Sequence, residues 1–202
     1  MKILVIDNHD SFVYNITGLL HTIRNKNVFP DFEWRIVLND EVNPDDAMHY
    51  DGLILSPGPG IPEEAGNLME VVQKCVGHVP ILGICLGFQA IAESYGALLS
   101  RLSSPRHGHL SHLVNIDRQD PLIGALADSS PSVGRYHSWI VKPSSLPEEL
   151  IPTSFDEEGN LMSFRHKILP LFGTQFHPES IITDCGQHIF KAFLSLVSKQ
   201  CK

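Results

Sequence analysis

The stretch that decides the fold is Val79-Pro80-Ile81-Leu82-Gly83-Ile84-Cys85-Leu86-Gly87-Phe88-Gln89-Ala90-Ile91. Its apolar run over 81–84 predicts a short buried strand, and the apolar residues that recur after it at helical spacing predict a helix. Cys85 therefore stands on a sharp turn between a strand and a helix, with Gly83 and Gly87 on either side. The serine of G-x-S-x-G hydrolases is held on the same kind of turn, with its side chain exposed above the sheet.

This position gives a cysteine the means to act as a nucleophile. A helix N-terminus favours the thiolate form, and glycines on both sides allow a tight backbone and leave room for a substrate. The backbone N–H of Leu86 is well placed to stabilise an oxyanion. The alternative is that Cys85 is a small buried hydrophobe, as a cysteine after an apolar strand often is. The turn alone does not decide between these interpretations.

Composition narrows the class of protein. A length of 202 residues is typical of one domain with a substantial core. The formal net charge of −8, with no basic run, argues against nucleic acid or an anionic membrane as a partner. No apolar run approaches a membrane span, and the first residues do not resemble a signal peptide. The cysteines form no C-x-x-C pair and no metal-ligand spacing, so we expect reduced thiols and a cytoplasmic location. They are Cys75, Cys85, Cys185 and Cys201.

Strand and helix patterns alternate through the first half of the chain, which favours βαβ units and a mostly parallel sheet. Strands are expected at 3–6, 33–40, 51–55 and 81–84, helices at 12–23, 68–76 and after Cys85, and a polar connection at 25–31. Asp10 or Ser11 could cap the first helix. Short strand-like segments then follow at 110–116, 139–141, 161–165 and 171–176. Polar turns separate them, which predicts a small antiparallel extension of the sheet before a closing helix over 188–197.

Two loops follow predicted strands at the edge where open α/β sheets build their sites. The loop over 7–11 is rich in polar side chains, and that over 56–62 contains two glycines and three prolines. A loop of the second kind is rigid, and its backbone can approach a ligand without interference from Cβ atoms. Ordinary turn and capping chemistry would explain both loops equally well.

A nucleophilic cysteine needs a base, and the base needs a group that orients it. The chain has eleven histidines, of which His177 is distinctive because it ends an apolar strand. Glu179 lies two residues further on, across Pro178, whose fixed φ can hold the two side chains in a set relation. His177 could then take the proton of Cys85 while Glu179 binds the other ring nitrogen. In isolation the pair would also fit an ordinary polar surface loop.

Three motifs in this order resemble the class I (triad) glutamine amidotransferase family over nearly the full length: Ser56-Pro57-Gly58-Pro59-Gly60, Gly83-x-Cys85-x-Gly87-x-Gln89 and His177-Pro178-Glu179. Two more resemble component II of anthranilate synthase and of aminodeoxychorismate (p-aminobenzoate) synthase: Asp7-Asn8-x-Asp10-Ser11-Phe12 and Arg135-Tyr136-His137-Ser138. The resemblance implies a flavodoxin-like α/β fold with a mostly parallel central sheet, helices on both faces and a small antiparallel extension. It also implies a single glutamine amidotransferase type 1 domain over 1–202.

The resemblance also implies a mechanism. Cys85 attacks the side-chain carboxamide of L-glutamine, with His177 as base and Glu179 as its partner. Backbone N–H groups of Gly58 and Leu86 form the oxyanion hole. The residues implied to bind the substrate are Gly58, Pro59, Gly60, Gln89, Ser138 and Trp139. No cofactor and no metal are implied for this chain.

The ammonia is implied to pass to a chorismate-binding synthase subunit (component I) in a heteromeric complex. Between the two pathways we favour p-aminobenzoate over anthranilate synthesis, with a subunit shared by both as an alternative. Two other classes stay open from the residues alone. One is another cysteine hydrolase of related architecture, such as a γ-glutamyl hydrolase or small peptidase. The other is a non-catalytic flavodoxin-like module.

Three features depart from the family pattern. Phe88 stands where relatives often carry histidine, which should not remove activity if His177 is the base. Trp139 stands where leucine is common and could reshape the glutamine pocket while leaving a backbone contact intact. The segment over 106–112 departs in a region that faces the synthase in the family. Its His107, His109 and His112 fit no standard zinc spacing, so we expect a polar loop leading into a strand.

Overall fold

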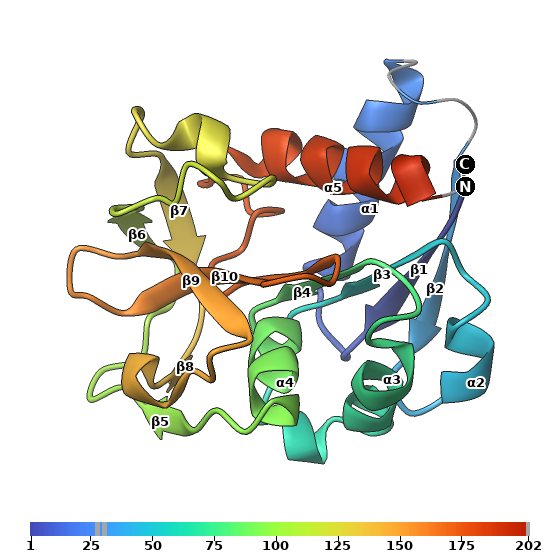
Figure 1. Ribbon diagram of the computed structural model, residues 1–202, viewed down its shortest axis with the longest axis horizontal. Helices are drawn as coiled ribbons and strands as arrows, with labels where there is room; N and C mark the ends of the chain where they lie inside the picture. Colours follow the sequence, from blue (N-terminus) through green and yellow to red (C-terminus); the bar gives the residue numbers. More distant parts are fainter. Residues whose placement is uncertain (27–28, 30–31, 201–202) are drawn as a thin grey trace.

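A computed structural model describes residues 1–26, 29 and 32–200. Its centre is a seven-stranded sheet in the order β2-β1-β3-β4-β11-β10-β9 (Figure 1). The first five of these strands run parallel, and the last two pair antiparallel. The strand bounds are β1 Lys2–Asp7, β2 Glu33–Leu38, β3 Gly52–Leu55, β4 Ile81–Ile84, β9 Leu150–Phe155, β10 Leu161–His166 and β11 Leu171–Thr174. The predicted mostly parallel sheet with an antiparallel extension is confirmed.

Helices cover both faces of the sheet because its inner strands are apolar on both sides. In β1, Ile3 and Val5 pack in one core with α1 (Val13–Asn25) and α5 (Gly186–Gln200). The alternate residues of β1, Leu4 and Ile6, pack in a second core with α3 (Leu68–Cys75) and α4 (Leu86–Ser94). The period of two along the strand thus assigns each side chain to one layer, and the two layers are visible in Figure 1.

Outside the main sheet lie two antiparallel pairs and several short helices. The strand β5 (Leu99–Arg101) pairs with β8 (Trp139–Val141), and β6 (His109–His112) pairs with β7 (Ser132–Arg135). The short helices are α2 Pro44–Ala47 and the 3-10 turns Pro62–Glu64, Gly124–Leu126 and Pro143–Ser145. The expected extension therefore consists of β9 and β10 on the main sheet together with these two separate pairs.

Several local predictions were wrong. The pattern of the sequence did not predict α2, β5, β7 or β9, and the strand expected over 110–116 ends at His112, with Val114 forming only an isolated bridge. Neither Asp10 nor Ser11 caps α1, because Phe12 occupies the cap position; the Asp10 carboxylate instead accepts a hydrogen bond from the Phe12 N–H at 2.8 Å. The connection expected over 25–31 lies mostly outside the described residues, as does Cys201.

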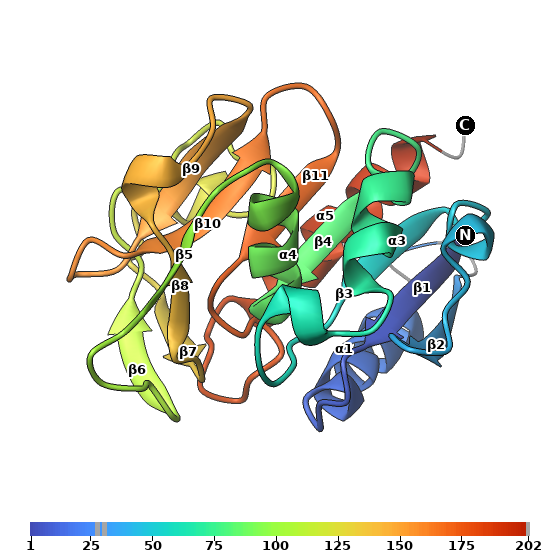
Figure 2. The same cartoon turned by 90° about the horizontal axis from the view of Figure 1, so that it is seen from below.

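The topology gathers the loops of interest at one edge. The strands β1, β3, β4 and β11 lie side by side and run parallel (Figure 2). The loops over 8–11 and 56–61, the Cys85 turn and the segment over 175–180 therefore all follow carboxyl ends of neighbouring strands. Within the described residues no helix is long and apolar enough to cross a membrane.

Candidate active site

Cys85 adopts a backbone conformation that residues other than glycine rarely take. Its φ is +51° and its ψ is −97°, at the cap position of α4. Such strain persists only where the surrounding structure fixes it, and it gathers at functional sites. Here the Cys85 N–H donates to the carbonyl of Thr174 at 2.8 Å, which ties the turn to the end of β11. The strand-turn-helix arrangement predicted from the sequence is thus present, and Cys85 is 5% exposed.

The glycines beside this turn are required by close packing. A Cβ atom on Gly83 would lie 2.6 Å from the carbonyl carbon of Gly87, and one on Gly87 would lie 2.6 Å from the carbonyl oxygen of Leu55. Real Cβ atoms do not approach backbone atoms so closely. These glycines therefore let α4 pack directly on β3 and β4, whereas room for a substrate is provided by other residues.

A cavity of about 240 Å³ opens next to Cys85. Seven residues predicted for the site line it: Gly58, Pro59, Gly60, Cys85, Gln89, Ser138 and Trp139. Four others were not predicted: Arg101, His107, Tyr136 and His137. The fully buried Phe88 stacks on Phe164, with ring centroids 4.6 Å apart, and belongs to the core rather than to this cavity.

His177 and Glu179 form a buried pair. His177 Nδ1 lies 2.7 Å from Glu179 Oε1, and both residues are at most 4% exposed. Among the described residues, His177 Nε2 has no hydrogen-bond partner. Burial alone would lower the pKa of His177, but the Glu179 carboxylate and the Cys85 sulfur outweigh it and raise the pKa above its usual value. His177 is thus electrostatically coupled to both other residues of the predicted triad.

Aromatic rings fix the orientation of this imidazole. The rings of Phe12 and Tyr136 each lie with their centroids 4.9 Å from that of His177, and 4.7 Å from each other. The Tyr136 hydroxyl lies 3.1 Å from Ser180 Oγ, which holds that ring in turn. The backbone N–H of His177 donates to the carbonyl of Gly134 at 3.0 Å. Both the ring and the backbone of His177 are therefore held by groups from outside its own loop.

The loop that follows β3 packs directly against the start of α4. A Cβ atom on Gly58 would meet the side chains of Leu86 at 2.5 Å and Asn8 at 2.6 Å. Leu86 is the first residue of α4, so its N–H has no partner within the helix. The Asn8 side chain donates to the Ser56 carbonyl at 2.8 Å, and its backbone N–H donates to Ser56 Oγ at 2.9 Å. The polar loop after β1 thus holds the glycine loop in place, beyond ordinary turn chemistry.

Gln175 was missed by sequence reasoning. Its side chain is fully buried, and Nε2 lies 3.7 Å from Cys85 Sγ. Gln89 Nε2 donates to Gln175 Oε1 at 3.1 Å and to the Trp139 carbonyl at 2.9 Å. A polar residue inside the apolar run before His177 was the only signal in the sequence.

In the segment over 106–112, His109 and His112 take part in surface contacts, whereas His107 lines the cavity. His112 Nδ1 lies 2.9 Å from Glu157 Oε1, with both side chains about half exposed. His109 lies 3.3 Å from the Arg106 guanidinium, and His107 lies edge-on to Tyr136, with centroids 6.4 Å apart. In the part of the chain that the structure describes, no group of three acidic, histidine or cysteine side chains could hold a metal ion.

The chain belongs to the class I glutamine amidotransferase family, whose model matches residues 4–197. It is 35% identical over 206 residues to "Aminodeoxychorismate/anthranilate synthase component 2" of Bacillus subtilis, covering 98% of both chains. It is 38% identical over 209 residues to "Bifunctional protein TrpGD" of Thermotoga maritima, of which it spans only 33%. Its structure resembles a crystal structure of a Thermoplasma acidophilum protein that is provisionally assigned to GMP synthase, with a TM-score of 0.84. That match covers 100% of this chain and 96% of the other at 26% identity.

Proposed function

We propose that this chain hydrolyses L-glutamine at Cys85 and supplies the ammonia to a chorismate-aminating synthase subunit. The observation that carries the proposal is the strained Cys85 turn, which lines the cavity and interacts with a buried His177–Glu179 pair. A cysteine serving only as a buried hydrophobe would need neither a left-handed backbone nor a charged partner.

In the first half of the reaction, the Cys85 thiolate attacks the carboxamide carbon, and an S–C bond forms while the carbonyl oxygen becomes an oxyanion. Backbone N–H groups of Gly58 and Leu86 stabilise that charge; losing one such donor typically costs about a hundred- to a thousandfold in rate. Since Nδ1 of His177 is bound to Glu179, Nε2 is the nitrogen that carries the exchanged proton. It protonates the amide nitrogen, the C–N bond breaks, and ammonia leaves.

In the second half, water attacks the γ-glutamyl thioester. His177 Nε2 accepts the proton of this water, the S–C bond breaks, and the thiolate is restored with release of glutamate. The net reaction converts glutamine and water into glutamate and ammonia. The substrate's amino-acid head would lie among Pro59, Gly60, Gln89 and the backbone of Ser138 and Trp139, which line the cavity.

A synthase partner is supported by the relatives. The Bacillus subtilis relative, which matches over nearly its whole length, is named a component 2 of two chorismate-linked synthases. We therefore propose a heteromeric complex with a component I subunit, in p-aminobenzoate synthesis by preference. The double name of that relative supports anthranilate synthesis, or service to both pathways, as the second candidate. The free thiols of Cys75, Cys85 and Cys185 suit the reducing cytoplasm that we propose as its location.

The test is glutamine hydrolysis by the wild type and by Cys85→Ser, alone and with each candidate synthase subunit. We expect cysteine-dependent hydrolysis that rises with at least one partner, and the partner that stimulates it identifies the pathway. Stimulation by both would indicate a shared subunit. Folded protein that hydrolyses no glutamine under any of these conditions would refute the proposal. Equal activity of Cys85→Ser and wild type would remove Cys85 from the mechanism.

A further inference from the structure

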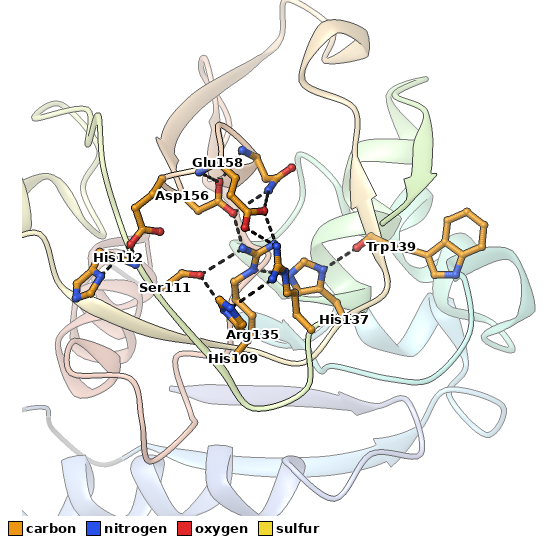
Figure 3. A network of polar contacts seen from close by, with 11 residues as sticks. His109, Ser111, His112, Arg135, His137, Trp139, Asp156 and Glu158 are labelled. Atoms are coloured by element: carbon orange, nitrogen blue, oxygen red, sulfur yellow. Dashed lines mark hydrogen bonds and ion pairs between the residues drawn. The ribbon is translucent and has the colours of Figure 1, made fainter. Parts of the chain in front are cut away.

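Arg135 and His137, from the motif over 135–138, belong to a buried hydrogen-bond chain (Figure 3). The Arg135 guanidinium is fully buried and pairs with the equally buried Asp156 carboxylate. Its Nε donates to His137 Nε2 at 3.1 Å. A guanidinium can only donate hydrogen bonds, so Nε2 must be the acceptor and His137 must carry its proton on Nδ1. Arg135 therefore selects one tautomer of the imidazole.

That tautomer determines the hydrogen bonds of the cavity wall. His137 Nδ1–H donates to the Trp139 carbonyl at 3.0 Å, and Gln89 Nε2 donates to the same oxygen at 2.9 Å. A carbonyl oxygen has two lone pairs, and both are now occupied. The Trp139 carbonyl is thus an internal anchor and is not free to accept a hydrogen bond from the substrate.

The anchor fixes the orientation of the Gln89 amide. One N–H of Gln89 is bound to Trp139 and the other to Gln175 Oε1 at 3.1 Å. The Trp139 carbonyl can accept a hydrogen bond only from the nitrogen of the Gln89 amide. Flipping this amide would therefore break the bond to Trp139. Gln89 Oε1 is the atom that is left, on a side chain that lines the cavity. An acceptor at this point suits a cation such as the α-ammonium group of an amino acid.

We propose that His137 is a positioning residue for substrate selection. Held by Arg135, it anchors the Trp139 carbonyl, which orients Gln89 so that Oε1 receives the α-ammonium group of glutamine. The inference rests on the proposed glutaminase function and adds a specific role for a motif that the triad does not use.

The charge distribution supports a positioning role. Burial and the neighbouring Arg135 lower the pKa of His137 to about 3, so the ring stays neutral and keeps the single Nδ1 proton. The Asp156 carboxylate also accepts hydrogen bonds from the backbone of Glu158 and from Asn160. A buried ion pair adds little net stability compared with apolar packing. The main contribution of the Arg135–Asp156 pair is to fix the direction in which Arg135 Nε donates to His137.

The experiment compares two near-isosteric substitutions of His137. The amide nitrogen of Asn can take the place of Nδ1, whereas that of Gln takes the place of Nε2 and leaves Trp139 without its second donor. Hydrolysis of L-glutamine is compared with hydrolysis of glutaramate, which lacks only the α-amino group. We expect His137→Asn to keep the preference for glutamine and His137→Gln to reduce it about tenfold, the effect of one hydrogen bond to a charged group.

A double substitution tests whether His137 acts through Gln89. In a Gln89→Leu background, which has already lost the acceptor, His137→Gln should cause no further loss of preference. The matched control is Arg165→Met, which breaks the partly exposed pair with Asp117, at 3.4 Å, outside the cavity. It should change thermal stability without changing the preference.

The outcomes are distinguishable. Wild-type protein that hydrolyses neither compound, alone or with a synthase subunit, would refute the proposed function. Active wild type with equal preferences in His137→Gln, His137→Asn and Arg165→Met would overturn the inference while leaving the function intact. Additive losses in His137→Gln and Gln89→Leu would also overturn it, because His137 would then act independently of Gln89.

Discussion

His137 and His177 are buried to almost the same degree near Cys85, the proposed nucleophile, yet their neighbours favour opposite charge states. His177 faces a carboxylate and the Cys85 sulfur, which outweigh burial and raise its pKa. His137 faces a guanidinium, and burial together with this positive charge lowers its pKa to about 3. The imidazole of His177 is therefore suited to proton transfer, and that of His137 to directed hydrogen bonding.

The two histidines also differ in how many of their ring nitrogens have hydrogen-bond partners. Both ring nitrogens of His137 have partners, and their distances are 3.0 and 3.1 Å. His177 has a partner on Nδ1 but none on Nε2 among the described residues. A buried polar atom without a partner costs free energy and is expected where a substrate or proton arrives. The open Nε2 of His177 fits the proposed role of that ring in proton transfer, whereas the fully paired ring of His137 fits a positioning role.

The largest effect should come from His177→Asn. Without a proton donor for the leaving ammonia, kcat/KM for glutamine should fall at least about a thousandfold. Steady-state ammonia release measures this, and the matched control is His137→Asn, which should lose far less. Similar losses in the two variants would contradict the division of roles between these histidines.

Glu179→Gln should have the next largest effect, on the order of a hundredfold in kcat/KM, because the base remains but loses its charged partner. Removing the carboxylate takes away a cause of the raised pKa of His177. The alkaline limb of the kcat/KM profile should therefore move to lower pH. A profile that drops in height without moving would show that Glu179 orients the ring but does not set its pKa.

The sequence alone was enough to suggest the proposed triad because the signals for it are local. Cys85 follows four apolar residues and precedes a helical pattern, and His177 and Glu179 are separated by a single proline. Backbone rules applied within a few residues are enough for such features. The class of sheet follows in the same way, from alternating patterns along the chain.

The rest of the site depends on long-range pairing. Gln175 contacts Cys85 across 90 positions, and Arg135 meets Asp156 across 21. Strand β7 (Ser132–Arg135) has no clear alternation and is positioned by β6 and by the bridge from Gly134 to His177. Nothing within a short window shows that an arginine will be fully buried, since burial of a charge depends on a partner supplied by the fold.

A third prediction uses pH-dependent stability to measure the charge state of His137. Its folded pKa is depressed, so its stabilising contribution is present above its unfolded value of 6.5 and is lost as pH falls from 6.5 towards 3. The expected slope is about 1.4 kcal/mol per pH unit. Relative to His137→Asn, which does not titrate, the wild type should lose about 2 kcal/mol between pH 6.5 and pH 5.

Urea unfolding of both proteins at several pH values gives this difference, and all other titrating groups cancel to first order. The corresponding contribution of His177 has the opposite sign. With a raised folded pKa, it is present below 6.5 and is lost as pH rises towards the folded value. Parallel stability curves for wild type and His137→Asn below pH 6.5 would mean that His137 is not held neutral.

The smallest effect is expected for His112, which forms a third histidine pair with nearly the same geometry. His112 Nδ1 lies 2.9 Å from Glu157 Oε1, compared with 2.7 Å for the pair of His177 and Glu179. The two pairs differ in their exposure to water, because the side chains of His112 and Glu157 are 50% and 48% exposed. Exposed ion pairs contribute between about 0 and 1 kcal/mol because solvent screens them. His112→Asn should therefore change glutamine hydrolysis less than about twofold in the isolated protein. A loss above tenfold would show that burial is not what separates the proposed catalytic pair of His177 and Glu179 from the surface pair.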